Sequence, residues 1–528
     1  MAGAGTITPR NETRGQLLLD KSVLHQNLTA LSRAIAAGLL SAVGMAAAGA
    51  SEHEGQQIDG EMGRPASFRV MSFNIEWGGA HVSFAGITDA IRAADADIVG
   101  IQEAEGNLAR LARDLGWHYD LRNHIVSKYP VIDPPGAGGK YVLVEVLPGR
   151  VVAIANVHLP PTPSGAAWFR AGRTPEQVVA MERRVRLSVM EPFLTALPGL
   201  ARQGMPVFLS GDFNSPSHED WIEAALGRFP RRDHIVPWPV TGAAAAAGLR
   251  DSFRDIHPDP VADPGFTWWA ARPKIADYNP ADKSLQTRID FVWYGGPAKV
   301  IDSRLVGEAG AREVDVTVVP WPSDHRAVVS GFEAIPAPMP LLVAAERKVH
   351  TSGTPIAFVY RNRTPRGSLV MERHGDSVVV ERRIALEPDA GQLKVRDNFL
   401  QPGFYQAVLQ DRAGHEVSRN EFWIVAPDAT PSVSVTGNRF ASGEPLPVVW
   451  QNAPGNRYDW IAIYEVNAAE KQKYRAWGYI GARSSGHMQV SAGNSQDDWP
   501  LAPGRYVARL LLDDGYALLA EAAPFVVD

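Results

Sequence analysis

From residue 68 onward, apolar residues occur in short runs with period two, and stretches of helical spacing separate these runs. Residues 83–94, for example, have the spacing of an amphipathic helix. Strands that alternate with helices are typical of a layered α/β domain, which we predict for residues 67–335. Several predicted strands end at polar residues: 68–73 at Asn74, 97–102 at Glu103, 151–157 at His158, and 207–210 just before Asp212 and Asn214.

The pattern between these strands predicts further elements of the same domain. Thr174, Pro175 and Gln177 have the order of a capping box at the start of a helix. Residues around 243 are rich in alanine and predict a loop, and an aromatic loop follows at 266–269. A strand over 288–294 contains Asp290, and a last pair of elements brackets Asp324 and His325.

The chain beyond residue 335 has a different texture. Residues 336–340 predict a proline-rich linker, and after it short alternating strands and Gly/Pro turns recur without a convincing helix. The segment 352–362 is echoed by 442–452, and 402–407 is echoed by 503–508. We therefore predict two related all-β sandwiches of immunoglobulin-like size, at 341–427 and 431–528.

The N-terminal residues 1–50 predict a leader. Residues 34–50 carry no charge, consist mostly of Ala and Gly, and close in Ala48-Gly49-Ala50, which resembles a signal-peptide cleavage site. An Ala-rich helix of the folded protein is the alternative. The signal-peptide interpretation predicts an exported protein, either periplasmic or secreted.

Composition limits the possible functions. The 528 residues have a formal net charge of -6, so the whole chain lacks the basic excess of a non-specific nucleic-acid binder. There is no cysteine, which excludes disulfides, a thiolate nucleophile and cysteine-ligated zinc.

The polar residues at the strand ends form a candidate site. Asp212 and Asn214 alone could equally make a turn, since Gly-Asp and Asn-Ser are ordinary turn sequences. Seven such residues in one domain are harder to explain by turns and caps: Asn74, Glu103, His158, Asp212, Asn214, Asp290 and His325. Carboxylates suit a hard divalent cation and an attacking water, whereas imidazolium and amide groups suit phosphate oxygens.

These residues lie in blocks that resemble the magnesium-dependent endonuclease/exonuclease/phosphatase (EEP) superfamily. The blocks are Ser72-Phe73-Asn74, Ile101-Gln102-Glu103, Asn156-Val157-His158-Leu159, Gly211-Asp212-Phe213-Asn214, Arg288-Ile289-Asp290-Phe291 and Ser323-Asp324-His325, in the family's order. The resemblance implies a four-layered α/β sandwich with the site at one end of two packed sheets.

The resemblance also implies roles for the residues. Glu103 would be the principal ligand of Mg²⁺, or of Mn²⁺, with Asn74 nearby and Asp324 helping to hold the metal. Asp212 would orient or deprotonate the attacking water, and Asn214 would bind the phosphate. Asp290 would keep His325 oriented and cationic, and His158 would be a second donor to phosphate.

Other polar residues near the blocks have simpler explanations. Glu76 is a weaker candidate for the site, and a solvated strand end is the favoured interpretation. The arginines at 170, 173, 183, 184 and 186 could contact phosphates, but an exposed basic helix face is the commoner explanation. One segment departs from the family pattern: 118–128 is shorter than the loop that relatives usually have, and the family's DNA-repair members carry a tyrosine near the site. The resemblance therefore does not favour duplex DNA as the substrate.

We therefore expect an exported, metal-dependent hydrolase of phosphoric esters, acting as a monomer on a lipid or a small phosphodiester. A secreted scavenging nuclease is the alternative, and the sequence does not separate diester from monoester substrates. A hypothesis of another class is a binding protein with a vestigial catalytic domain, in which the β-sandwiches attach it to an envelope or matrix surface.

Overall fold

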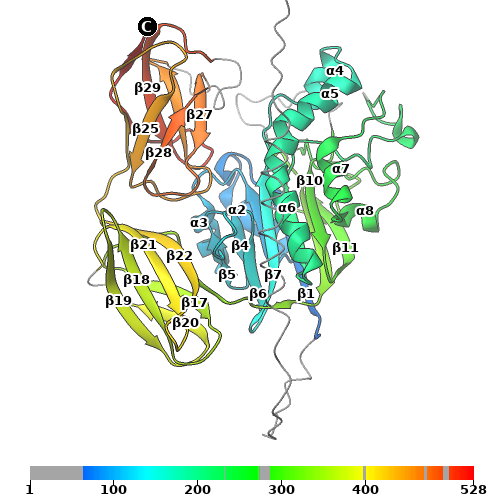
Figure 1. Ribbon diagram of the computed structural model, residues 1–528. Helices are drawn as coiled ribbons and strands as arrows, with labels where there is room; N and C mark the ends of the chain where they lie inside the picture. The colour runs from blue at the N-terminus through cyan, green and yellow to red at the C-terminus, as the bar shows by residue number, and fades with distance from the viewer. Residues whose placement is uncertain are drawn as a thin grey trace, which may run out of the picture. The chain divides into compact units, whose positions relative to one another are not determined.

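A computed structural model of the chain (Figure 1) describes the structure of residues 63–230, 232–271, 273, 286–396, 400–468, 473–491 and 499–528. The predicted signal segment at 34–50 lies outside the described residues. Residues Gly63–Asp528 form one unit by their internal contacts. Within the described ranges, no helix has the length and apolar character needed to span a membrane.

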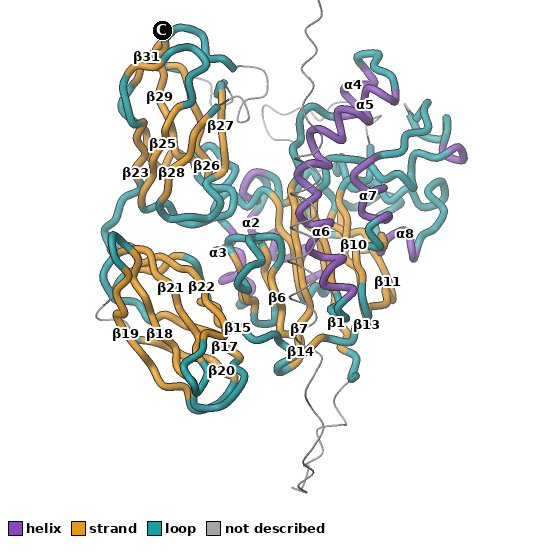
Figure 2. Tube along the Cα trace, viewed as in Figure 1, coloured by secondary structure: helices purple, strands orange, loops and turns teal. Residues whose placement is uncertain are grey.

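Two seven-stranded sheets form the α/β part of the chain (Figure 2). The first has the order β12-β11-β13-β1-β2-β4-β3, and β1 runs parallel to β2 and antiparallel to β13. Its strands are β1 (Ala66–Asn74), β2 (Ile98–Gln102), β3 (His118–Asp120), β4 (Ile125–Ser127), β11 (Ala298–Gly307), β12 (Val316–Thr317) and β13 (Ala327–Ala334).

The second sheet has the order β5-β6-β7-β8-β10-β9, with β14 paired to β7. The parallel pair β7 and β8 and the antiparallel pair β8 and β10 lie at its centre. Its strands are β5 (Val131–Ile132), β6 (Val142–Leu147), β7 (Arg150–His158), β8 (Val207–Asp212), β9 (Arg250–Asp251), β10 (Asp290–Gly295) and β14 (Ala337–Pro338).

Helices cover the outer faces of the sheets. They are α2 (Phe84–Ala93), α3 (Leu108–Leu115), α4 (Gly165–Arg170), α5 (Pro175–Glu182), α6 (Ser188–Arg202), α7 (Pro239–Ala246) and α8 (Ser252–Ile256), with short turns of helix at Trp77–Gly79, Arg183–Leu187 and Glu223–Ala225. Ser83 caps α2 by accepting a hydrogen bond from the Gly86 amide, and the capping box predicted at Thr174 is present at the start of α5.

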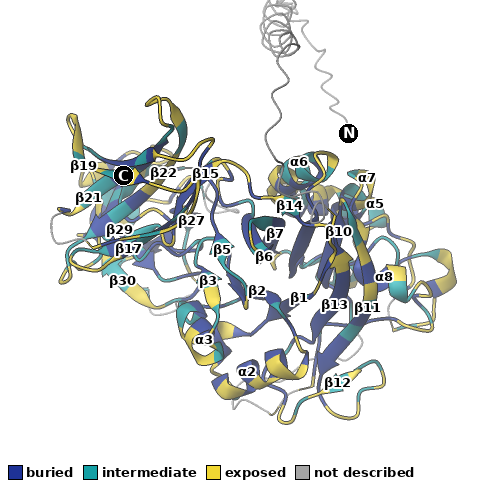
Figure 3. Cartoon of the chain, turned by 90° about the horizontal axis from the view of Figure 1, so that it is seen from below, coloured by how far each residue is buried: buried dark blue, intermediate teal, exposed yellow. Residues whose placement is uncertain are grey.

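Alternation along the strands explains the layers. On β8, Phe208 packs between the sheets with Val70 and Ile154, whereas the neighbouring Leu209 packs on the opposite face with α6. The outer face of the first sheet packs against α2 and α3, whose exposed residues face outward (Figure 3). The predicted four-layered α/β sandwich is confirmed.

The C-terminal region consists of strands in paired sheets. The first module has sheets β15-β17-β20 and β16-β22-β21-β18-β19, and the second has β23-β25-β28 and β24-β31-β29-β26-β27 with β30 on β29. The strands are β15 (Leu342–Ala345), β16 (Val349–Thr351), β17 (Ile356–Arg361), β18 (Gly367–His374), β19 (Val378–Leu386), β20 (Ala390–Val395), β21 (Gly403–Gln410), β22 (Glu416–Val425), β23 (Ser432–Val435), β24 (Arg439–Phe440), β25 (Leu446–Gln451), β26 (Trp460–Glu465), β27 (Ala476–Tyr479), β28 (Gly486–Val490), β29 (Gly504–Leu511), β30 (Leu518–Glu521) and β31 (Phe525–Val527).

The sequence repeat appears as a structural repeat. The repeated Pro-Gly turns precede β21 and β29, and in each case a tyrosine two residues after the proline-glycine pair donates a hydrogen bond backward. The Tyr405 hydroxyl donates to the Gln401 carbonyl at 2.7 Å, and the Tyr506 hydroxyl donates to the Ala502 carbonyl at 2.8 Å. The two modules thus fix corresponding corners in the same way.

Within the predicted linker at 336–340, β14 pairs with β7. Two local predictions are wrong. The Ala-rich segment near 243 forms α7, because Val240 and Ala244 pack into the core beside α6. Arg186, which was predicted to lie on an exposed basic helix face, is fully buried. It donates hydrogen bonds to Glu182 at 2.7 Å and to the Pro161 and Pro163 carbonyls. The other four arginines of that group are exposed.

A buried ion-pair network supports the end of β10 and yields a stability prediction. Arg288 donates to Asp220 through two 3.0 Å hydrogen bonds and also contacts Asp251. The substitution Arg288→Met leaves two buried carboxylates without this partner. The free energy of unfolding of the α/β part should therefore fall by about 3–5 kcal/mol. Urea denaturation followed by tryptophan fluorescence measures this change.

Arg439→Met is the matched control, because Arg439 and its partner Asp528 are both exposed. Its effect should stay below about 1 kcal/mol. Equal midpoints for the two variants would contradict the supporting role of Arg288.

Candidate active site

Three side chains of the candidate site come from neighbouring strands of the second sheet. His158 ends β7 and lies opposite Asp212 on the parallel strand β8. Asp290 begins β10 and lies opposite Asp212 on its other side. Strand register alone therefore places an imidazole and two carboxylates next to one another at one end of this sheet.

The first sheet contributes residues to the same place. Asn74 is the last residue of β1, and Glu103 directly follows β2. The Asn74 Nδ2 group donates to Glu103 Oε1 at 3.0 Å and to Asp212 Oδ2 at 3.1 Å. Asn74 thus joins the polar ends of the two sheets.

The Glu103 carboxylate is held at both oxygens. In addition to the Asn74 bond at Oε1, the Trp77 amide donates to Oε2 at 2.9 Å. Glu103 has a positive φ angle of 56°. Three nearby residues also have positive φ angles: Glu76 (55°), Trp77 (43°) and Asn214 (48°). Non-glycine residues in this conformation are concentrated at functional sites, where surrounding contacts offset the strain.

His325 is paired with Asp290. Its Nδ1 lies 2.9 Å from Asp290 Oδ2, and its Nε2 lies 3.7 Å from Asp212 Oδ2. Burial lowers the pKa of His325, but the charges of Asp290, Asp212 and Asp324 outweigh it and raise the pKa well above its usual value. The paired imidazole is therefore cationic at neutral pH.

His158 has a similar electrostatic environment. Its Nε2 lies 3.7 Å from Asp212 Oδ2 and 4.0 Å from Glu103 Oε1. Burial opposes its charge, but a hydrogen bond to Asp514 and the charges of Asp212 and Glu103 raise its pKa to about 9. Two cationic imidazoles therefore face one oxygen of Asp212.

Asp212 differs from an ordinary surface aspartate. Burial and the neighbouring Asp290 raise its pKa to about 6, against the opposing effects of His325 and His158. Its other oxygen, Oδ1, accepts a 2.8 Å hydrogen bond from the backbone N–H of Asn214. A carboxylate with a pKa near neutrality suits proton transfer better than a fully solvated one.

Asn214 and Asp324 lie at the edge of this group. The Asn214 Nδ2 donates one proton to the Leu159 carbonyl at 3.1 Å, which leaves its second proton for another acceptor. The Asp324 amide donates to Glu76 Oε2 at 3.1 Å. Glu76 is only 3% exposed, so its interpretation as a solvated strand end is wrong.

Two groups of residues could hold a cation. Glu103 offers a fixed carboxylate beside Asn74, which fits the oxygen ligands that a hard divalent ion prefers. Asp212, Asp290 and His325 also offer ligand atoms within 4.8 Å of one another. In the second group a cation would compete with the 2.9 Å contact between His325 Nδ1 and Asp290 Oδ2.

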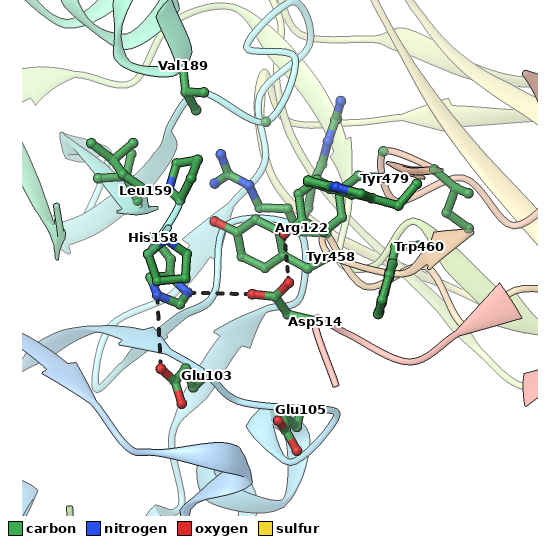
Figure 4. A pocket seen from close by; sticks show the side chains of 18 of the residues that line it. Glu103, Glu105, Arg122, His158, Leu159, Val189, Tyr458, Trp460, Tyr479 and Asp514 are labelled. Atoms are coloured by element: carbon green, nitrogen blue, oxygen red, sulfur yellow. Dashed lines mark hydrogen bonds and ion pairs between the residues drawn. The ribbon is translucent and has the colours of Figure 1, made fainter. Parts of the chain in front are cut away.

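A cavity of about 1230 Å³ opens beside Glu103 and His158. Its wall includes residues of the second β-module that the sequence did not indicate, among them Tyr458, Tyr479 and Asp514 (Figure 4). The segment 118–128 forms the hairpin of β3 and β4, and its His124 contacts Asp513 at 2.8 Å. Leu512-Asp513-Asp514-Gly515 has the composition of a simple hairpin turn, so its sequence gave no sign of a site.

The sequence of the chain is similar to those of known proteins. Residues 71–325 match the Endonuclease/Exonuclease/phosphatase family. An uncharacterized protein of Caenorhabditis elegans is 30% identical over 296 residues, which are 51% of this chain and 91% of that protein.

Solved structures also resemble the chain. An endonuclease/exonuclease/phosphatase from Beutenbergia cavernae has 15% identity and a TM-score of 0.31, covering 68% of this chain and 100% of that one. A family protein from Bacteroides thetaiotaomicron has 15% identity and a TM-score of 0.31, covering 52% and 96%.

The chain belongs to the endonuclease/exonuclease/phosphatase family. Members of this family are phosphoesterases and nucleases that depend on divalent metal ions. The predicted strand-end residues lie together here at the ends of both sheets, and their individual roles stay predictions.

The geometry at Glu103 predicts a metal-binding effect that needs no substrate. Glu103→Gln keeps the side chain's shape but removes its charge, so the affinity for Mg²⁺ or Mn²⁺ should fall by about tenfold or more. Isothermal titration of the full chain with MnCl₂ measures the affinity. Glu333→Gln is the control, since Glu333 is exposed and pairs with Ser67 near the opposite end of β1. An unchanged affinity for Mn²⁺ in Glu103→Gln would exclude Glu103 as a ligand of the metal ion.

Proposed function

We propose that the protein is an exported hydrolase of phosphoric esters, a phosphodiesterase that acts on a lipid or a small diester and uses a divalent metal ion. The observation that carries this proposal is the environment of Asp212 Oδ2. This oxygen lies 3.1 Å from Asn74 Nδ2 and 3.7 Å from Nε2 of both His158 and His325. Asp212 is buried and His158 lines the cavity, so proton-donating groups surround this carboxylate next to a cavity that could admit a substrate. Such an arrangement suits an anionic substrate and its attacking water.

The proposed reaction is attack of water on phosphorus in line with the leaving oxygen. Asp212 takes one proton of the water as the new P–O bond forms, and the ester oxygen leaves with the electrons of the broken P–O bond. The leaving oxygen then gains a proton from solvent, and Asp212 releases its proton to solvent. A cation held by Glu103, with Asn74 and Asp324 nearby, would supply positive charge to the phosphate oxygens.

The two histidines and Asn214 act on the negative charge of the phosphate oxygens. His325, oriented by Asp290, and His158 donate hydrogen bonds to phosphate oxygens as negative charge develops in the transition state. Asn214 has one amide proton available for the same purpose. The cavity beside Glu103 has room for the organic part of the ester.

Export and surface attachment complete the proposal. Export rests on the uncharged, small-residue segment at 34–50. Attachment of the protein to an envelope or matrix surface through its β-modules, a monomeric state and a preference against duplex DNA are also proposed. The scavenging nuclease and the vestigial domain remain as outcomes of the test below.

The test compares the full chain with Asp212→Asn on sphingomyelin vesicles, DNA, RNA, inositol phosphates, bis(4-nitrophenyl) phosphate and 4-nitrophenyl phosphate. Each substrate is incubated with Mg²⁺ or with EDTA. At least one ester should be hydrolysed in a metal-dependent way, and Asp212→Asn should reduce kcat by about 10²–10⁴-fold through loss of the general base.

Asp89→Asn is the matched control, because Asp89 is an exposed residue of α2. Preferred hydrolysis of DNA or RNA would favour the nuclease. Failure to hydrolyse any ester in a metal- and Asp212-dependent way would overturn the enzymatic proposal and favour the vestigial domain.

A further inference from the structure

A loop of the second β-module reaches the candidate active site. This loop joins β29 to β30 and contains Asp513 and Asp514, which have positive φ angles of 45° and 66°. Asp514 Oδ2 lies 3.5 Å from His158 Nδ1, and the Tyr479 hydroxyl donates to Asp514 Oδ1 at 2.6 Å (Figure 4). One carboxylate therefore contacts both the catalytic-domain imidazole and a tyrosine of its own module.

The neighbouring aspartate fixes this loop against the α/β part. Asp513 is fully buried; its Oδ1 lies 2.8 Å from His124 Nε2 and its Oδ2 accepts from the Gly106 amide at 2.7 Å. The Asp514 amide donates to the Tyr458 carbonyl at 2.9 Å. A loop held on both sides by buried hydrogen bonds can place the Asp514 carboxylate reproducibly.

A second, half-buried contact between the two parts lies next to the loop. The Arg457 guanidinium donates to the Asn156 carbonyl at 3.1 Å, and the Arg457 amide donates to the Leu121 carbonyl at 3.2 Å. Asn156 is in β7, two residues before His158. The strand that carries the imidazole is thus contacted by the second β-module at two points.

These contacts determine how His158 presents its second nitrogen. An imidazole that donates Nδ1–H to a carboxylate has a fixed ring orientation and directs Nε2 to the opposite side. Here Nε2 faces Asp212 Oδ2 and Glu103 Oε1. We propose that Asp514 is a positioning residue for His158, so that the second β-module completes the active site of the α/β domain.

This inference rests on the proposed function, and it changes the expected role of the β-modules. A module that only attached the protein to a surface could be altered without effect on a small substrate. Asp514→Asn should instead lower kcat for bis(4-nitrophenyl) phosphate by about 10–100-fold and leave KM nearly unchanged, because positioning is lost while substrate contacts remain. Tyr479→Phe should have a smaller effect in the same direction.

Glu521→Gln is the matched control, since Glu521 pairs with Arg509 within the same module and does not line the cavity. Its kcat should equal that of the unaltered protein. Equal kcat for Asp514→Asn and the unaltered protein would overturn the inference.

Histidine NMR separates failure of this inference from failure of the proposed function. The protein is labelled with ¹⁵N-histidine, and the His158 signal is assigned as the one that disappears in His158→Gln. The Nδ1–H resonance of His158 should be observed in the unaltered protein, and it should shift or broaden in Asp514→Asn. An unaltered resonance would overturn the positioning role whether or not any ester is hydrolysed. An altered resonance in a protein inactive on every ester would overturn the proposed function alone.

The lining of the cavity carries a second inference. Besides Glu103 and His158, aromatic residues of the second β-module line this cavity, including Tyr474, Trp477 and Tyr516. The Trp477 ring lies edge-on to Tyr479, with a 4.9 Å centroid distance, and Tyr479 contacts Asp514. We infer that this aromatic wall binds the organic group of the ester, and that it favours a group with a flat apolar face.

Calorimetry of ligand binding tests this second inference without turnover. In the presence of Mg²⁺, phenyl phosphate should bind the full chain more tightly than inorganic phosphate, and Trp477→Ala should remove that difference. Trp423→Ala is the control, because Trp423 lies in the first β-module and does not line the cavity. Equal affinity for the two ligands in the unaltered protein would overturn the inference.

Discussion

The close approach of the two sheets beneath the site determines where every candidate residue lies. Gln102 Nε2 donates to Asn156 Oδ1 at 2.6 Å across the interface, and Ser210 also contacts that oxygen at 3.3 Å. A Cβ atom at Gly100 would lie 2.1 Å from Ser210 Oγ, so only glycine fits there. This buried polar contact brings the ends of β1 and β2 within hydrogen-bond distance of the end of β8.

Charge balance is the second constraint on the site. Asp212 and Asp290 lie side by side on neighbouring strands, and their repulsion and burial oppose the charge on Asp212. The cationic imidazoles of His158 and His325 offset part of this cost. The same arrangement raises the pKa of Asp212 and keeps the surrounding imidazoles cationic, and the contact of His158 with Asp514 extends it to the second β-module.

The sequence predicted what depends on local pattern. Period-two runs located the central strands, and the residues at their ends lie together because neighbouring strands end at the same edge of a sheet. Burial that depends on distant partners was not predictable. Glu76 and Arg186 look solvated in sequence, yet one accepts from the Asp324 amide and the other pairs with Glu182. Asp513 is 389 positions from His124, and hairpin-turn composition carries no information about such a contact.

We propose that the cation lies at Glu103 and leaves Asp212 for the attacking water. Anomalous diffraction from crystals of the full chain soaked with MnCl₂ distinguishes this arrangement from a cation at Asp212. A manganese peak bonded to a Glu103 oxygen is expected, with His325 uncoordinated and still paired with Asp290. A principal peak bonded to Asp212, Asp290 and His325, with none at Glu103, would overturn the proposed assignment of the cation.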